Sequence, residues 1–453
     1  MYKFTPLLLT AVLSSFVLAP STGDDLTQEQ LEEMTAGILK DIESMRGTKF
    51  LRGVDVALAN KEGFLKYAMD RTETMTTPER LNAEETVMKM LGLLDPDVDF
   101  MKAQLDMLEE QVGGFYDPAT ESFFLMDSFQ GGLAKIILAH ELTHALDDQL
   151  YDIDGTLERL EGSGDAQLAY QAVVEGSGTT NMNSWLKQNL DQISMDELAD
   201  FGDMGMDSMK TAPEVMWKPT LMVYMRGAAF LVRSGNVMVG QTKTVDLDDL
   251  HQAFTNPPRS TEQILHPEKY WDEEQLDEPM LVKLGTEQLE GWKTLHSDTL
   301  GEATLALVTT PPDKRKGLDA SDAMGMMLLK YTNRDAEGWG GDRYVLLQKD
   351  DTLVLHLVTV WDTERDAKQF YENIAEQSDH LDESLGKLGG ETAMSSAKVE
   401  LMSDTRVVKL TFVASKSMVA GIDEMVSEIE VTIEEPAMPE AKMPEEAELP
   451  EAK

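Results

Sequence analysis

The sequence predicts an α+β protein, built as a mainly helical part with one β-hairpin and a following C-terminal α+β domain. Apolar residues recur at the spacing of amphipathic helices over residues 24–110 and over most of 111–284. Two short aromatic runs on either side of a turn predict the hairpin. Over residues 285–433, strand-like runs are interspersed with helix-like ones, as is typical of an α+β domain. A chain of 453 residues is too long for one hydrophobic core, so several domains are expected.

The composition is strongly acidic, with 83 Asp and Glu against 39 Lys and Arg and a formal net charge of −44. Such a charge repels phosphate backbones and anionic lipid, which excludes nucleic acid as a partner and docking on an acidic membrane surface. Hydrophobic residues make up 42% of the chain, which is enough to build folded cores. There is no Cys, so neither disulfides nor a lipoprotein anchor are expected.

Residues 1–21 are typical of a secretory signal peptide. Lys3 supplies the positive end, Leu7 to Leu18 the apolar stretch, and Ala19 to Ser21 the small residues of a cleavage site. We therefore expect an exported protein, periplasmic or secreted; the alternative is a segment that stays as an uncleaved anchor. After cleavage no stable membrane insertion is expected, because polar residues interrupt the apolar segment 220–240 at Arg226, Arg233 and Asn236.

The N-terminal region, residues 24–110, is helical in pattern. Thr27 and Gln30 form a capping box before an apolar stripe, and Thr77 precedes a further helix that begins with Pro78. Whether these helices are a removable pro-segment is left open by the sequence.

The hairpin is predicted from two runs, Gly113–Tyr116 and Ser122–Leu125, separated by the turn Asp117–Thr120. It lies shortly before an apolar helix that begins near Leu133. A strand in this position can pair with an extended peptide, and an ordinary hairpin with no role in binding is the equal alternative.

The helix after the hairpin carries the sequence His140-Glu141-Leu142-Thr143-His144. Two His four residues apart lie on one helix face, so both imidazoles can bind one zinc ion, Zn²⁺. Glu141 follows the first His and lies beside the metal position, where it can take a proton from water as a general base. The apolar residues around the motif favour a buried metal site over a surface cluster of His and Glu.

A catalytic zinc site needs a third protein ligand and one open position. Glu175 is the leading candidate, because it lies on a separate predicted helix, residues 165–187, and the adjacent Gly176 and Gly178 allow close approach. The competing carboxylates are Asp147, Asp148 and Asp165. Asp148 is instead assigned as the hydrogen-bond acceptor for an imidazole N–H.

Peptide hydrolysis also needs a donor for the oxyanion that forms beside the metal. His266 is the leading candidate, because it precedes Pro267 at the end of a short helix capped by Ser260 and projects from that end. Tyr270 and Tyr224 are weaker candidates, and a His satisfied by local capping is an equal alternative.

The last third of the chain contains a Gly- and Trp-rich motif and an acidic C-terminal segment. The motif Gly338-Trp339-Gly340-Gly341-Asp342-Arg343-Tyr344 is interpreted as a tight turn leading into a strand, with Asp342 and Arg343 in structural contacts, rather than as a binding loop. Residues 434–453 are rich in Pro, Glu and Ala and are predicted to be a disordered acidic tail.

With these residues identified, the chain resembles the zincin metallopeptidases, and among them the gluzincins, whose zinc is held by the two His of the motif and a downstream Glu. The resemblance implies a zincin-like catalytic domain over residues 111–284, with Glu141 as the base and three ligands, His140, His144 and Glu175. Many gluzincins carry Asp four residues after the ligand Glu, where this chain has Thr179. The acceptor for an imidazole then comes from elsewhere.

The chain is also similar to a poorly characterised group of exported bacterial proteins regarded as metallopeptidases. The similarity extends from about Leu51 to Phe370 and includes Ala139–Gln149, Val174–Gly176, Pro257–Tyr270 and the Gly-Trp-Gly-Gly-Asp-Arg-Tyr stretch. It implies a zinc peptidase and names no substrate.

The sequence thus predicts an exported, zinc-dependent metallopeptidase that hydrolyses a peptide or protein substrate, with Glu141 as base and His266 as oxyanion donor. One alternative is a non-catalytic acidic binding or scaffold protein on a zincin-like fold. The other is a metal-dependent amide hydrolase acting on a non-protein substrate, such as a cell-wall amide. Oligomeric state and cleavage specificity are not predicted.

Overall fold

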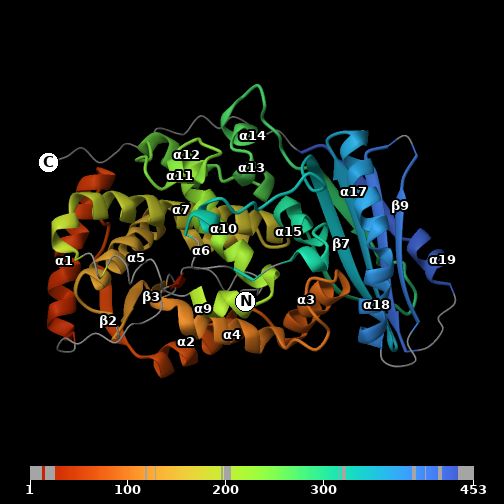
Figure 1. Cartoon of the computed structure of the whole chain (residues 1–453), viewed down its shortest axis with the longest axis horizontal. Helices are drawn as coiled ribbons and strands as arrows, with labels where there is room; N and C mark the ends of the chain where they lie inside the picture. The colour runs from red at the N-terminus through yellow and green to blue at the C-terminus, as the bar shows by residue number, and fades with distance from the viewer. Residues whose placement is uncertain are drawn as a thin grey trace.

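The computed structural model is a mixed α+β structure, 53% helical and 18% strand. A helical half and a half built on an antiparallel sheet lie side by side along the longest axis of the molecule (Figure 1). The fold class expected from the sequence is therefore confirmed at this level. The structure describes residues 13–15, 26–117, 120–127, 129–194, 197, 206–315, 317–318, 323–389, 394–403, 405–416 and 421–436.

The helical half contains the long helices that the apolar periodicity predicts. Thr27 forms the expected capping box with Gln30, and Ser260 caps its helix as expected. Pro219 lies in the interior of the helix that spans residues 214–231. The helices are α1 (Gln28–Arg46), α2 (Lys61–Met75), α3 (Pro78–Met90), α4 (Phe100–Gln111), α5 (Gly131–Tyr151), α6 (Ile153–Arg159), α7 (Gly164–Gln188), η2 (Leu190–Gln192), α9 (Met206–Thr211), α10 (Glu214–Leu231), α11 (Val237–Gly240), α12 (Leu247–Thr255), α13 (Thr261–Leu265) and α14 (Glu268–Trp271).

A small sheet packs against α5. Its strand order is β1-β3-β4-β2, and the strands are β1 (Leu13–Ser15), β3 (Val112–Asp117), β4 (Ser122–Met126) and β2 (Asp55–Ala59). The antiparallel pair β3–β4 is the predicted hairpin. Strand β2 lies in the region expected to be helical, and it forms because it pairs in parallel with the distant β4.

Strand β1 comes from the segment predicted to be a signal peptide, and it pairs antiparallel with β3. The rest of that prediction, residues 1–12 and 16–21, lies outside the described residues. The predicted tail also lies outside them from residue 437 onward, while Glu434 ends a strand. In the part of the chain that the structure describes, no helix is both long and apolar enough to cross a membrane.

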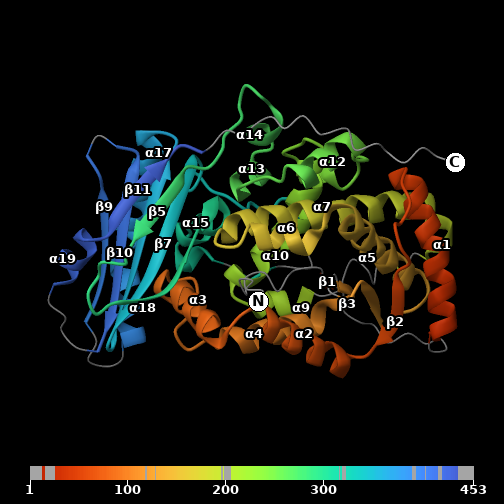
Figure 2. The same ribbon diagram turned by 180° about the vertical axis from the view of Figure 1, so that it is seen from behind.

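The second half is built on a five-stranded antiparallel sheet of order β6-β7-β8-β10-β9. Helices α17 and α18 cover one face, and β5, β11 and α19 lie on the other (Figures 1 and 2). The strand after Gly338 confirms the turn-and-strand interpretation of that motif. The elements are β5 (Leu281–Gly285), β6 (Lys293–Asp298), α15 (Gly301–Val308), η3 (Pro312–Lys314), α16 (Ala323–Met327), β7 (Trp339–Lys349), β8 (Thr352–Trp361), α17 (Glu364–Glu376), α18 (Ser378–Gly389), β9 (Met394–Leu401), β10 (Val407–Ser415), α19 (Ile422–Ser427) and β11 (Glu430–Glu434).

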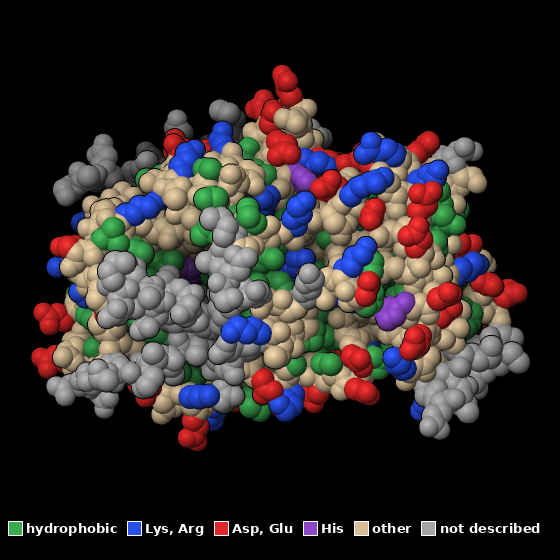
Figure 3. Space-filling model, viewed as in Figure 1, with side chains coloured by type: hydrophobic (Ala, Val, Ile, Leu, Met, Phe, Trp, Pro, Cys, Tyr) green, Lys and Arg blue, Asp and Glu red, His purple; other side chains and the backbone are tan. Residues whose placement is uncertain are grey.

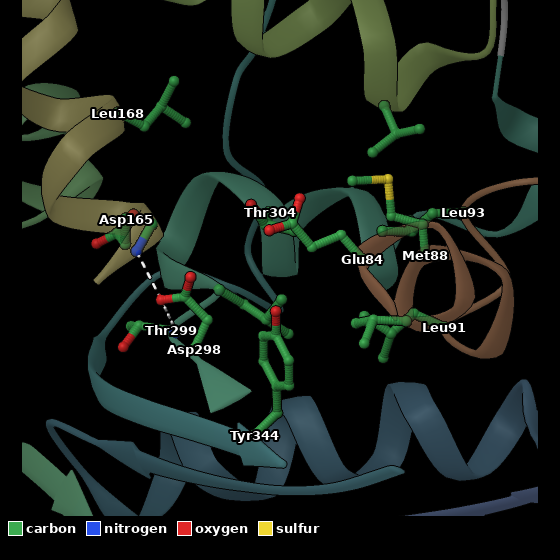
Figure 4. Close-up of a pocket in the computed structure, with 14 residues that line it drawn as sticks. Glu84, Met88, Leu91, Leu93, Asp165, Leu168, Asp298, Thr299, Thr304 and Tyr344 are labelled. Carbon is green, nitrogen blue, oxygen red and sulfur yellow. Dashed lines mark hydrogen bonds between the residues drawn. The ribbon is translucent and has the colours of Figure 1, made fainter. Parts of the chain in front are cut away.

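One hydrophobic core spans both halves and extends from α3 and α7 to the five-stranded sheet, while a separate core surrounds α1, α5 and the small sheet. Where they meet, a cavity of about 40 Å³ is lined mostly by apolar side chains, together with Glu84, Asp298 and Tyr344 (Figure 4). Asp298 Oδ1 accepts a hydrogen bond from the backbone N–H of Gly164 at 2.7 Å, which joins β6 to the first residue of α7. The sheet half is thus attached directly to a long helix of the other half.

Candidate metal centre

Helix α5 holds the His-Glu-Leu-Thr-His motif in the interior. Every residue from Ile136 to Gln149 is buried, because α1, α7, β3 and β4 all pack against this helix. His140 and His144, one turn apart, direct their rings to the same point, and their Nε2 atoms lie 2.9 Å apart. The predicted pairing of the two imidazoles on one helix face is present.

Helix α7 brings Glu175 to these rings. Its Oε2 lies 3.1 Å from His140 Nε2 and 3.4 Å from His144 Nε2, and all three residues are at most 1% exposed. We refer to His140, His144 and Glu175 as the donor triad. Of the competing carboxylates, Asp147 accepts from Arg46 and Ser177, and Asp165 accepts from Thr261.

Two glycines of α7 allow close approach to its neighbours, Gly178 to the imidazoles of α5 and Gly176 to α10. A Cβ on Gly178 would lie 2.7 Å from His140 Cε1 and 2.8 Å from His144 Cε1, which is closer than carbon atoms approach. A Cβ on Gly176 would lie 2.4 Å from the carbonyl carbon of Gly227 in α10. The expectation that small residues permit close approach at Glu175 is therefore confirmed.

The donor triad fits a zinc ion in both spacing and charge. Zn–N and Zn–O bonds of 2.0–2.2 Å in a tetrahedron place ligand atoms roughly 3.3 Å apart, close to the separations seen here. Burial and the neighbouring His144 lower the pKa of His140, which keeps that imidazole neutral. Burial raises the pKa of Glu175, but the two imidazoles outweigh burial and hold that pKa at about 2. A neutral His140 and an ionised Glu175 are the forms of these two residues that bind zinc.

Glu141 and Tyr224 lie next to the donor triad. A carboxylate oxygen of Glu141 is within 4.8 Å of a ring nitrogen of each His, and its Oε2 accepts a hydrogen bond from Tyr116 N at 3.1 Å. Tyr116 belongs to β3, so the strand runs alongside the motif. The ring of Tyr224, on α10, has its centroid 6.0 Å from that of His140. In the space-filling view, a histidine lies at the bottom of a hollow in the helical half (Figure 3).

The structure gives Asp148 partners other than the one assigned from the sequence. Its Oδ2 accepts from the hydroxyl of Tyr116 and its Oδ1 from the N–H of Ile153, both at 3.1 Å. Successive helix residues point about 100° apart, and this turns Asp148 toward β3. Among the described residues, Nδ1 of His140 and Nδ1 of His144 have no hydrogen-bond partner.

His266 is also not brought to the donor triad. It caps the end of α13, and its Nε2 lies 3.0 Å from Oε1 of the buried Glu302 on α15. Burial lowers the pKa of His266, but Glu302 outweighs burial and the net shift is upward. Tyr270, another candidate from the sequence, donates its hydroxyl to Asn256 O at 2.6 Å. Of the three predicted donors, only Tyr224 is next to a triad imidazole.

Sequence reasoning missed a buried polar group beside the triad. Asp147 accepts hydrogen bonds from Arg46, the last residue of α1, and from Ser177 of α7. The spacing of seven residues between His140 and Asp147 was the available signal, because it puts both on one face of α5.

Comparison with known proteins covers only part of the chain. Residues 287–413, which include most of the five-stranded sheet, match a family described as a domain of unknown function, DUF8575. No curated protein and no solved structure matches the chain.

Proposed function

We propose that this protein is an exported zinc-dependent metallopeptidase with a zincin-like, gluzincin-type site. The observation that carries the proposal is the convergence of three buried donor atoms within 3.4 Å of one another, with a further carboxylate beside them. Two imidazoles and a carboxylate are a donor set that catalytic zinc uses. Export rests on the sequence of residues 1–21.

The donor triad would hold the ion, which when bound supplies a Lewis acid and lowers the pKa of water. Glu141 is the base in this proposal, because its carboxylate lies beside the triad and Tyr116 N–H fixes its orientation. It takes the proton from the attacking water and passes it to the leaving amine. Tyr224 takes the place of His266 as the donor to the oxyanion, since its ring is next to His140.

A peptide is favoured as substrate over other amides because of β3. Its neighbour on one side is β4, and its only other partner among the described strands is β1, from the predicted signal peptide. Once residues 1–21 are cleaved, the backbone of β3 has free hydrogen-bonding groups beside Glu141. An extended peptide can then add to the sheet as a strand.

The test combines metal analysis with hydrolysis of an unstructured protein by the mature chain. We expect about one zinc per chain, loss of zinc in His144→Ala, and retention of zinc with at least a 100-fold lower rate in Glu141→Gln. His380→Ala removes a surface His of α18 and serves as the matched control.

Each result separates the alternatives. Full activity of the Glu141→Gln protein contradicts the proposed mechanism. Bound zinc without cleavage of any peptide favours the scaffold protein, and cleavage of cell-wall amides alone favours the non-protein hydrolase.

A further inference from the structure

Three buried side chains from three helices form a closed hydrogen-bonded group next to the donor triad. Asp147 Oδ2 accepts from Ser177 Oγ at 2.5 Å and from Arg46 Nη1 at 3.4 Å, and Arg46 Nη1 also donates to Ser177 Oγ at 2.9 Å. Arg46 Nη2 donates to the second carboxylate oxygen of Asp147. Their exposed fractions are 8%, 0% and 1% for Arg46, Asp147 and Ser177. We refer to these three residues as the Arg–Asp–Ser group.

This group connects the two helices that carry the donors. Asp147 follows His144 by three residues on α5, and Ser177 follows Glu175 by two residues on α7. The hydrogen bond between Asp147 and Ser177 therefore joins α5 to α7 within one helical turn of the donors on both sides. A small shift of α7 along α5 would move the carboxylate of Glu175 away from the imidazoles.

The charge of the group is balanced internally. A buried carboxylate is costly unless it is paired, and Arg46 provides the cation with a bidentate contact. The pairing leaves Asp147 with both oxygens occupied by Arg46 and Ser177. Because Arg46 holds the carboxylate of Asp147 in place, Asp147 can fix the position of Ser177 and therefore of α7.

We propose that Asp147 and Ser177 are positioning residues for the metal centre, held by Arg46 and setting the offset between α5 and α7. The inference rests on the proposed function, because it assigns the group a role in metal affinity. Residues that support metal ligands change affinity by about 10- to 100-fold when they are replaced. A role limited to folding would change stability and leave metal affinity unaltered.

The experiment replaces the hydroxyl of Ser177 and leaves the ion pair in place. Ser177→Ala removes the hydrogen bond from Ser177 to Asp147 that joins α7 to α5, whereas Ser184→Ala removes a hydroxyl that donates to Thr180 O within α7 and is the matched control. Zinc dissociation constants are measured by competition with a chromogenic chelator, and the unfolding midpoints of the metal-free proteins are measured in parallel. We expect zinc binding about 10- to 100-fold weaker in Ser177→Ala and unchanged in Ser184→Ala.

The outcomes separate this inference from the proposed function. An unchanged zinc dissociation constant in Ser177→Ala, with zinc bound by the wild type, overturns the positioning role and leaves the metal centre intact. Zinc bound by the wild type without peptide hydrolysis overturns the proposed peptidase and leaves the positioning role standing. A wild-type protein that binds no zinc overturns both.

Discussion

Three consecutive polar residues at the end of α5 have three separate tasks. Asp147 is bonded to Arg46 and Ser177, and Asp148 to Tyr116 and Ile153. Gln149 accepts from the backbone N–H groups of residues 51 and 52. Each step along a helix turns the side chain by about 100°, so neighbours in sequence reach different elements. The residues after the motif therefore anchor the helix on three sides.

Tyr224 gives a test at the level of one hydroxyl. We expect Tyr224→Phe to lower kcat about 100-fold with unchanged zinc content, because the variant keeps the ring beside His140 and removes the donor. Tyr270→Phe is the comparison, since its hydroxyl bonds Asn256 O away from the triad and its loss should alter only stability. Equal kcat values for Tyr224→Phe and the wild type would exclude the donor role.

At the level of elements, α1 is part of the structure around the metal centre. Leu31, Ile38 and Ile42 are at most 4% exposed and pack in the same core as α5, and each contributes roughly 2 kcal/mol of burial. Arg46 adds the buried ion pair with Asp147. These contacts argue against α1 as a pro-segment that is removed on maturation.

Strand β1, unlike α1, belongs to a segment that is predicted to be removed on maturation. It contributes three residues to the edge of β3, at Val112, Gly114 and Phe115, and Tyr116 of the same strand bonds Glu141. It therefore covers the edge that the proposed function assigns to the substrate.

Two shortened chains test these roles together. We expect a chain beginning at Leu26 to fold and to hydrolyse peptides faster than the full chain, because β3 is uncovered. A chain beginning at Thr48 lacks α1 and should lose the cooperative thermal transition in circular dichroism. A synthetic peptide of residues 8–20 added to the first chain should slow hydrolysis again. Identical rates for the full chain and the chain from Leu26 would contradict the blocking role of β1.

For the whole molecule, buried carboxylates at the junction of the two halves make stability depend on pH. Glu84, on α3, is 2% exposed and points into the junction cavity (Figure 4), with Arg80 Nε bonded to its Oε1 at 3.0 Å. Burial above all raises the pKa of Glu84 from 4.5 to about 8. Its carboxyl group therefore stays protonated in the folded protein at neutral pH.

The sign of the pH effect follows from this shift. The unfolded chain releases the Glu84 proton near pH 4.5, and the folded chain releases it only near pH 8. The free energy of unfolding therefore decreases as the pH rises from 4.5 to 8. Glu84→Gln cannot ionise, and we expect its melting temperature to exceed that of the wild type by an amount that grows from pH 4.5 to 8. The difference in unfolding free energy should reach a few kcal/mol. Glu85→Gln, a substitution at the adjacent residue, is the control. A difference in melting temperature between Glu84→Gln and the wild type that stays constant from pH 4.5 to 8 would contradict this account.

Many secondary-structure elements of this protein, and the His pair of its site, are determined by local sequence. Capping residues and apolar periodicity predicted α1, α3, α5 and α7, the aromatic runs predicted the β3–β4 hairpin, and strand-like runs predicted strands of the second half. The His pair was readable because a four-residue spacing places two rings on one helix face. Each of these features depends on residues that are close along the chain.

The tertiary structure alone decided which distant groups meet. It joined Arg46 to Asp147 and Ser177, paired His266 with Glu302, and put Tyr224 beside His140. It also made β2 a strand, since that segment becomes extended only by pairing with β4. Local pattern shows that a side chain lies on some face of an element, but what that face meets is decided by how elements pack across the whole chain.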